Sequence, residues 1–391
     1  MQGKNFICCF VVLIGCLSVN AQWVKQDLGT SSSLVKIYFK NDSVGFIGGA
    51  DYTMFKTSDR GKTWNLQSLP ASTAQSDMIV DINFPTEDIG YALPNLKSID
   101  GGNTWDTITD FGSYSGGLYF IDELIGFTPG YKTIDGGMNW EWINLSGGSP
   151  RTDVLFINDS VGFITATYDS GIWKTTDGGN TWEIKDWGNN IRQITFASDS
   201  TGYAIGSIWE GLRKTTDQGE TWVGLNVPYA FEGCITCPDN DTCYVGSYYR
   251  GIMKTVDGGQ NWFVQDSTVK NISSIYCFDG NTCIAVGDSG KVYKTTNGGG
   301  PVSVGGMGEK NNEIKIFPNP FGASTTIEFD NKKNEKYSLR IYNTTGQRVR
   351  KIENIITGKI KIERENLKSG LYFFQLMNNR HSFGSGKMMI E

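Results

Sequence analysis

A nine-residue motif that recurs along most of the chain constrains the fold more than any other feature of the sequence. At residues 174–182 it reads Lys-Thr-Thr-Asp-Gly-Gly-Asn-Thr-Trp. Six copies have Asp at the fourth position and end in Trp, and a seventh has Asn and lacks the Trp; the turn residues are Asp59, Asp100, Asp135, Asp177, Asp217, Asp257 and Asn297. Successive copies are about 40 residues apart, a period typical of propeller blades that contain several short strands each.

The motif has the chemistry of a tight turn between two strands. Gly adopts positive φ without steric cost and Asp bonds to its own nearby backbone, so Asp-x-Gly favours a hairpin. The Thr and Trp that follow suit a strand with a large apolar contact. Because the same Asp recurs in six equivalent turns, we interpret these residues as structural and not as one catalytic site.

The motif resembles the Asp-box (S/T-x-D-x-G-x-T-W) of bacterial neuraminidase repeats. That motif is shared by sialidases, the sortilin ectodomain, xyloglucanases and photosystem II assembly factor-like proteins, in which it closes the hairpin of the two outer strands of a blade. Upstream, five units also carry a Phe followed six residues later by Gly, as at Phe196 and Gly202. Seven units of four strands predict an all-β fold with a seven-bladed β-propeller at residues 22–303.

The mature N-terminus is expected to complete the last blade. The seventh unit has a glycine-rich run where its fourth strand should be. Residues 22–29 correspond position by position to residues 181–188, with Trp23 at the place of Trp182. This strand would close the ring and remove two free sheet edges.

The first 21 residues are typical of a signal peptide. Lys4 provides the positive charge, an apolar run follows, and Val-Asn-Ala precedes a cut at Gln22. A lipoprotein signal at Cys16 is the alternative. No later stretch is apolar enough to cross a bilayer, so no transmembrane segment is expected after cleavage.

The charge is unevenly distributed along the chain. From Glu309 onward there are 15 basic and 9 acidic residues, net +6, which leaves net −12 for the rest. An acidic body argues against nucleic acid as a partner.

Four cysteines occupy the Phe and Gly positions of the last two units. Cys237 and Cys243 lie six residues apart, as do Cys277 and Cys283. Positions that face each other across a hairpin in an exported chain predict two disulfides, each worth roughly 2 kcal/mol. A zinc site that uses Cys234 and Cys237 is the alternative, but no His or second CxxC supports it. We expect no metal, no cofactor and a free, buried Cys234 thiol.

The C-terminal segment differs in character from the repeats. Its strands alternate with Gly and Asn turns and predict a small Ig-like β-sandwich at residues 313–391, after a Gly-rich linker at 304–312. It resembles the type A C-terminal sorting domain of the type IX secretion pathway of Gram-negative bacteria, through motifs that contain Pro318, Asn319, Pro320, Gly346, Gly370 and Lys387. The resemblance implies the type IX machinery as a partner and an extracellular or outer-membrane surface location.

Two classes of function remain, a binding module and a glycosidase. The only histidine, His381, lies in the predicted tail, so the propeller offers no His base. A glycosidase needs two carboxylates at a set separation. The carboxylates in the predicted loops are more simply interpreted as turn residues; they are Asp51, Asp169, Glu210 and Asp288. We expect a propeller that binds a glycan or protein ligand without catalysis; a glycoside hydrolase of sialidase or xyloglucanase type is the alternative.

Aromatic side chains gather in the loops of blades four to six, on the face opposite the Asp-box turns. Aromatic rings beside a few polar groups suit sugar stacking or a protein hot spot. The predicted ligand-binding residues are Trp187, Trp209, Glu210, Tyr229, Tyr248, Tyr249 and Arg250.

Overall fold

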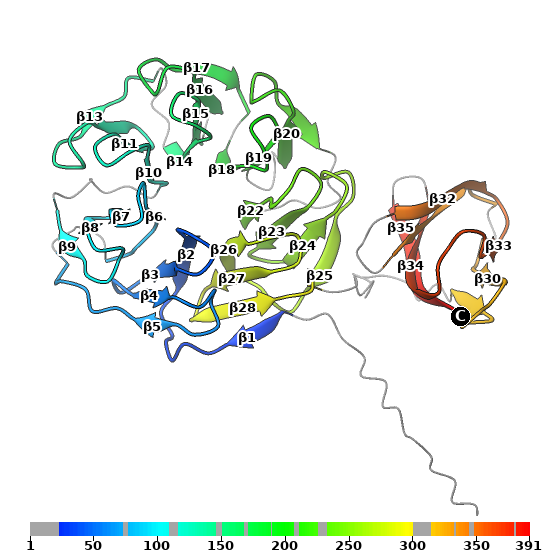
Figure 1. Ribbon diagram of the computed structural model, residues 1–391. Helices are drawn as coiled ribbons and strands as arrows, with labels where there is room; N and C mark the ends of the chain where they lie inside the picture. Colours follow the sequence, from blue (N-terminus) through cyan, green and yellow to red (C-terminus); the bar gives the residue numbers. More distant parts are fainter. Residues whose placement is uncertain are drawn as a thin grey trace, which may run out of the picture.

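Seven four-stranded antiparallel sheets stand around a central axis in the described part of the chain (Figure 1). The computed structural model describes residues 23–72, 77–108, 116–145, 151–167, 171–188, 190–206, 211–225, 233–299, 314–331, 334–343, 348–378 and 381–391. The predicted signal peptide and the predicted linker therefore lie outside the described residues. The all-β fold, a propeller followed by a sandwich-like tail, agrees with the prediction.

In six blades, four consecutive strands run from the axis outwards. Blade one contains β2 (Leu34–Phe39), β3 (Gly45–Gly49), β4 (Met54–Thr57) and β5 (Asn65–Leu66). Blade two contains β6 (Ile82–Asn83), β7 (Gly90–Ala92), β8 (Leu96–Ser98) and β9 (Asp106–Thr107). Blade three contains β10 (Tyr119–Phe120), β11 (Gly126–Thr128), β12 (Tyr131–Thr133) and β13 (Glu141–Trp142).

The remaining four blades are also four-stranded. Blade four contains β14 (Arg151–Phe156), β15 (Gly162–Ala166), β16 (Ile172–Thr175) and β17 (Glu183–Asp186). Blade five contains β18 (Ile191–Phe196), β19 (Gly202–Gly206), β20 (Leu212–Thr215) and β21 (Val223–Leu225). Blade six contains β22 (Gly233–Thr236), β23 (Cys243–Ser247), β24 (Gly251–Thr255) and β25 (Phe263–Asp266). Blade seven contains β26 (Ile272–Cys277), β27 (Cys283–Gly287), β28 (Lys291–Thr295) and, as its outer strand, β1 (Val24–Gln26).

The N-terminal strand closes the ring, as the repeat alignment predicts. β1 pairs antiparallel with β28, with Val24 opposite Lys294. Trp23 is only 3% exposed and meets the ring of Tyr244 edge to face, with the centroids 6.1 Å apart. The first and last parts of the propeller are thus hydrogen-bonded neighbours (Figure 1).

Each Asp-box carboxylate is hydrogen-bonded within its own turn. In blade four, Asp177 Oδ1 accepts the backbone N–H groups of Asn180 and Thr181 at 3.0 and 2.8 Å. Its Oδ2 accepts the Thr181 hydroxyl at 2.6 Å, and the Thr175 hydroxyl donates to Oδ1 at 2.8 Å. These bonds, led by that of the Thr181 hydroxyl, lower the pKa of Asp177 to about 2.

The lysine that begins each motif connects neighbouring blades, a role that the sequence analysis did not assign. Lys56 Nζ donates to Gly101 O and Asn103 Oδ1 in the Asp-box turn of blade two, at 3.1 and 2.8 Å. From blade seven, Lys294 Nζ reaches Arg60 O in blade one at 2.7 Å. In six blades the ammonium also lies 4.9 to 5.9 Å from the ring centroid of a second-strand aromatic, within cation–π range; the lysines are Lys56, Lys97, Lys132, Lys174, Lys214 and Lys254.

The recurring Phe and Gly pair marks a close cross-strand contact. Phe39 and Gly45 are directly opposite in β2 and β3, and a Cβ at Gly45 would lie 2.6 Å from the Phe39 ring. A disulfide takes the place of this contact in the last two blades. Cys277 lies opposite Cys283 and is bonded to it, and Cys237 is bonded to Cys243.

The tail is a sandwich of two sheets around its own apolar core. Its strands are β29 (Lys315–Phe317), β30 (Ser324–Glu328), β31 (Tyr337–Tyr342), β32 (Arg348–Ile355), β33 (Lys359–Glu363), β34 (Gly370–Asn378) and β35 (His381–Ile390). The Asn319 side chain fastens the last strand, because its Oδ1 accepts the N–H of Met389 at 2.7 Å and its Nδ2 donates to Lys387 O at 3.1 Å. The Pro-Asn-Pro motif therefore has a structural role at the chain end.

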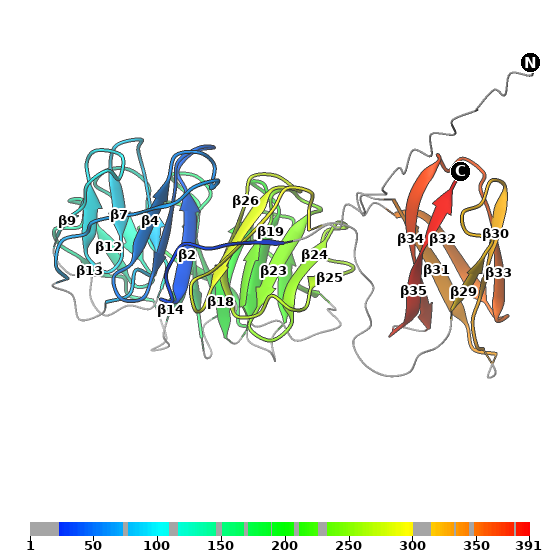
Figure 2. The ribbon, with the colours of Figure 1, turned by 90° about the horizontal axis from the view of Figure 1, so that it is seen from below.

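The tail contacts the rim of blade six, and the edge-on view places it beside that blade (Figure 2). The ring of Tyr342 on β31 meets Phe263 on β25 edge to face, with the centroids 5.3 Å apart. Arg340 donates to the Asn261 side chain of the neighbouring Asp-box. The tail thus contacts the edge of the propeller disc.

Candidate functional site

The predicted aromatic surface is described only in part. Trp209, Glu210 and Tyr229 lie outside the described residues. Trp187 follows β17 in blade four and is 68% exposed, whereas Tyr248, Tyr249 and Arg250 share the turn between β23 and β24 in blade six. The described members therefore come from two blades separated by blade five.

The turn of blade six holds Tyr249 outward. The buried Ser247 hydroxyl accepts the N–H groups of Tyr249 and Arg250, both at 3.3 Å, and Tyr249 is 70% exposed. Gly251 has φ 83°, and a Cβ there would lie 1.9 Å from Asp266 O, so no larger residue fits. The exposed ring thus stands on a closely fitted turn.

Trp187 stands on a braced turn as well. Asp186 Oδ1 accepts the N–H of Gly188 at 2.7 Å, and Asp186 Oδ2 pairs with Arg213 Nη1 of blade five at 2.9 Å. Such preorganisation reduces the entropy lost when a ligand binds.

A ring of seven equivalent positions, six of them with side chains, surrounds the axis and was not predicted from the sequence. Its members lie three residues before the Phe or Cys that ends the first strand pattern of each blade: Lys36, Asp81, Gly117, Asp153, Gln193, Cys234 and Ser274. Several reach the innermost strand of the next blade. Asp81 Oδ2 accepts Leu118 N at 2.9 Å, and Gln193 Oε1 accepts Ile235 N at 2.8 Å. Their common position in the repeat could have revealed this ring, but the residue types differ from blade to blade.

Three charged members of this axial ring interact. Lys36 Nζ pairs with Asp81 Oδ1 at 2.8 Å, and Asp153 Oδ2 accepts Ile194 N at 3.1 Å. Burial raises the pKa of Asp153 to about 7, although the Lys36 ammonium and the bond from Ile194 act in the opposite direction. Burial also opposes the charged form of Lys36, but the attraction of Asp81 and then Asp153 outweighs it and raises the Lys36 pKa.

Replacing Asp153 by Asn should flatten the pH dependence of stability between about pH 4 and 7. The folded pKa of Asp153, about 7, exceeds that of an unfolded Asp, about 3.9, so the folded state holds the extra proton in this range. Stability of the wild type therefore falls as pH rises through the window. We expect the melting temperature of Asp153→Asn to gain a few degrees on the wild type from pH 5 to pH 8, since about 1 kcal/mol shifts it by roughly 2–4 °C. If the melting temperatures of the wild type and of Asp153→Asn change by the same amount with pH, the raised pKa does not belong to Asp153.

Cys234 is a free thiol and only 4% exposed, as expected. Burial raises the pKa of this thiol to about 12. Cys237 is in a disulfide, so the two residues of the CxxC cannot both ligate zinc. Among the described residues, no group of three or more His, Cys, Asp or Glu side chains is placed to hold a metal ion.

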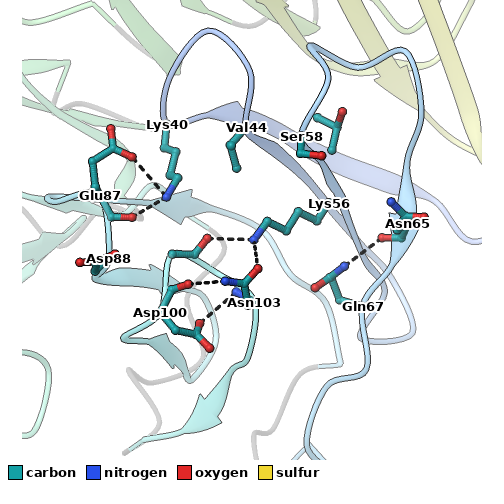
Figure 3. Close-up of a pocket in the computed structure, with 12 residues that line it drawn as sticks. Lys40, Val44, Lys56, Ser58, Asn65, Gln67, Glu87, Asp88, Asp100 and Asn103 are labelled. Atoms are coloured by element: carbon teal, nitrogen blue, oxygen red, sulfur yellow. Dashed lines mark hydrogen bonds and ion pairs between the residues drawn. The ribbon is translucent and has the colours of Figure 1, made fainter.

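A cavity of about 490 Å³ lies between blades one and two, beside their Asp-box turns (Figure 3). Its lining residues are Lys40, Val44, Lys56, Thr57, Ser58, Asn65, Gln67, Glu87, Asp88, Asp100, Gly101 and Asn103. Lys40 is bonded to Glu87 O and lies 3.4 Å from Glu87 Oε2. We name this cavity the inter-blade pocket; it was not predicted from the sequence.

Comparison with known proteins relates the two parts of the chain to two families. Residues 17–121 match the family model described as Photosynthesis system II assembly factor YCF48, and residues 315–391 match that of the Secretion system C-terminal sorting domain. A photosystem II assembly lipoprotein Ycf48 from Synechococcus is 24% identical over 195 residues, 47% of this chain and 48% of the relative. The chain thus spans about half the length of this curated relative.

Solved structures support the same architecture. YCF48 bound to D1 peptide superposes with a TM-score of 0.57 at 19% identity, over 70% of this chain and 97% of that one. The chain joins a YCF48-like β-propeller to a type IX secretion sorting domain. A GH74 enzyme from Niastella koreensis superposes with a TM-score of 0.55 at 14% identity, over 93% of this chain and 74% of that one. At these identities the superpositions show a likeness of fold alone.

The sorting-domain match implies export to the cell surface or the extracellular space. Of the residues expected to carry the tail motifs, Asn319 and Lys387 meet at β35, Gly370 begins β34, and Gly346 lies outside the described residues. Within the described part of the chain, no helix has the length and hydropathy of a membrane span.

Proposed function

We propose that this protein is exported by the type IX secretion machinery and binds a glycan or a protein outside the cell without catalysis. The observation that carries this proposal is the union of a YCF48-like propeller with a sorting domain in one chain. Propellers present rigid turns on their faces, and the described aromatic residues stand on such turns. A relative solved with a bound D1 peptide supports a peptide as one class of ligand.

Several carboxylates in the described part of the propeller favour binding over hydrolysis. A glycosidase acid needs a raised pKa, whereas hydrogen bonds lower the pKa of Asp100, Asp177 and Asp217 to about 2. Asp51 accepts the Ser32 hydroxyl at 2.8 Å as a turn residue. Asp153 has a raised pKa, but it lies in the axial ring, bonded to backbone N–H groups.

The alternative is a glycoside hydrolase of sialidase or xyloglucanase type, and it draws on fold likeness to GH74 enzymes. A screen of the purified protein on sialosides and β-glucans separates the two classes. Sustained turnover of either substrate class would replace the binding proposal by the hydrolase.

Changing Trp209, Tyr248 and Tyr249 to Ala should abolish binding and leave the melting temperature nearly unchanged. Aromatic hot-spot residues contribute about 2 kcal/mol or more each, roughly thirtyfold in Kd, and Tyr249 is 70% exposed. Binding would be measured on a glycan array and on fixed cells of a bacterium that uses the type IX pathway.

Trp142→Ala is the matched control, because Trp142 is 57% exposed on the outer strand of blade three. Binding that survives the triple change, or unfolding of the triple variant, would show that the aromatic surface is structural and that the site lies elsewhere.

A further inference from the structure

The inter-blade pocket lies at a junction where one side chain departs from the pattern of the repeat. In several blades, the side chain three residues after the motif Trp lies against the Asp-box turn of the next blade. From blade seven, Gln26 Nε2 donates to Gly61 O at 3.0 Å. In the amide orientation that satisfies both neighbours, the Gln265 nitrogen of blade six donates to Gly298 O and Gly299 O at 3.0 and 3.1 Å.

Other blades fill this position by charge or by bulk. In blade four, Lys185 pairs with Glu220 of the next turn at 2.8 Å. In blade five, Leu225 packs so close to Gly259 that a Cβ there would lie 2.6 Å from it. In blade three the position is Ile143, which packs against the apolar core of that junction.

Blade one has Gln67 at this position, and its amide folds back. Gln67 Nε2 donates to Asn65 O in its own strand at 3.2 Å, as Figure 3 shows. The space that Gln26 and Gln265 fill elsewhere is therefore left as a cavity of about 490 Å³. This volume falls within the range of small-ligand pockets, about 300–1,000 Å³.

The polar lining suits an uncharged ligand. Lys40 is paired with Glu87, and Lys56 donates to Gly101 O and Asn103 Oδ1, so both ammonium groups are already bonded. Asp100 is bonded within its own turn through the Thr104 hydroxyl and N–H. An anionic ligand would meet the carboxylates of Glu87 and Asp88, and a cationic ligand would meet the two lysines.

The groups that remain toward the cavity include the amides of Asn65 and Gln67, the Ser58 hydroxyl and the Asp88 carboxylate. Amides and hydroxyls both donate and accept hydrogen bonds, as sugar hydroxyls do. We propose that the inter-blade pocket binds a neutral, hydroxyl-rich saccharide. It is built from other residues than the aromatic surface, so either site can fail without the other.

The test measures binding of neutral oligosaccharides to the mature chain. Cellotetraose, mannotetraose, laminaritetraose and xyloglucan heptasaccharide would be titrated calorimetrically into the wild type and into Gln67→Ile. This variant places the side chain of blade three in the pocket of blade one. We expect at least one sugar to bind the wild type and its Kd to rise at least about tenfold in Gln67→Ile, a loss of about 1.4 kcal/mol.

Gln26→Ile is the matched control, because it makes the same change at the same repeat position of another junction, and it should bind as the wild type does. If Gln67→Ile does not fold, Asn65→Ala decides, since Asn65 is exposed and its amide lines the pocket. The proposal is overturned if none of the sugars binds, or if the folded pocket variants bind with wild-type affinity.

Discussion

A chain that begins at residue 30 should lose its single cooperative unfolding transition. Without β1, β28 becomes a free edge, and the site of the buried Trp23 beside Tyr244 is left empty. Truncation of a buried Trp alone costs about 3–5 kcal/mol, and here a strand's hydrogen bonds are lost as well. Calorimetry and guanidinium titration of the exported form would measure the loss.

Two comparisons make this prediction specific. Trp23→Ala should lower the stability by several kcal/mol, whereas Val24→Ser should have little effect, because Val24 is 58% exposed on the same strand. A synthetic peptide of residues 22–29, added in excess, should restore part of the transition by mass action. A truncated chain that melts like the wild type would disprove closure by this strand.

Removing residues 313–391 should leave the propeller folded and stop export. The tail forms a separate sandwich with its own core, and its match to the secretion sorting domain covers residues 315–391. In a host with the type IX pathway, the shortened protein should remain in the periplasm, as detected by immunoblots of the cell fractions. Conversely, residues 310–391 fused to a fluorescent protein should carry it out of the cell.

A single-residue variant refines the export prediction. Asn319→Ala removes both bonds that fasten β35, so we expect export to fall severalfold through loss of order at the chain end. Lys361→Ala is the matched control, because Lys361 is an exposed residue of β33 outside the predicted sorting motifs. Export of the fusion protein by a host that lacks the pathway would contradict the assignment of the tail.

Most of the architecture could be predicted from the residues that form the turns. The Asp-box copies predict the number of blades because each closes a hairpin by local bonds that depend on a few adjacent residues, as around Asp177. The correspondence of Trp23 with the later Trp residues was equally local and predicted the closing strand. The cysteine pairs followed from the Phe and Gly positions for the same reason.

The sites depended on packing between blades, which the sequence pattern does not encode. Gln67 and Gln26 are the same residue type at the same repeat position, yet one folds back and the other reaches the next turn. The axial ring was equally hidden, because Lys36, Asp153 and their equivalents share a place but no chemistry. The aromatic surface stays a prediction, since Trp209, Glu210 and Tyr229 lie outside the described residues, and so do the predicted domain boundaries.

The pairing of Val24 with Lys294 has a mechanical consequence. The propeller begins and ends on two adjacent strands, so both of its chain ends leave the disc at one place on its rim. The tail also meets the disc at its edge, where Tyr342 contacts Phe263 of blade six, so a load on the tail enters the disc at the rim. A force transmitted along the chain from the tail reaches β28 first. The hydrogen bonds of β28 to β1 on one side and to β27 on the other then share this force.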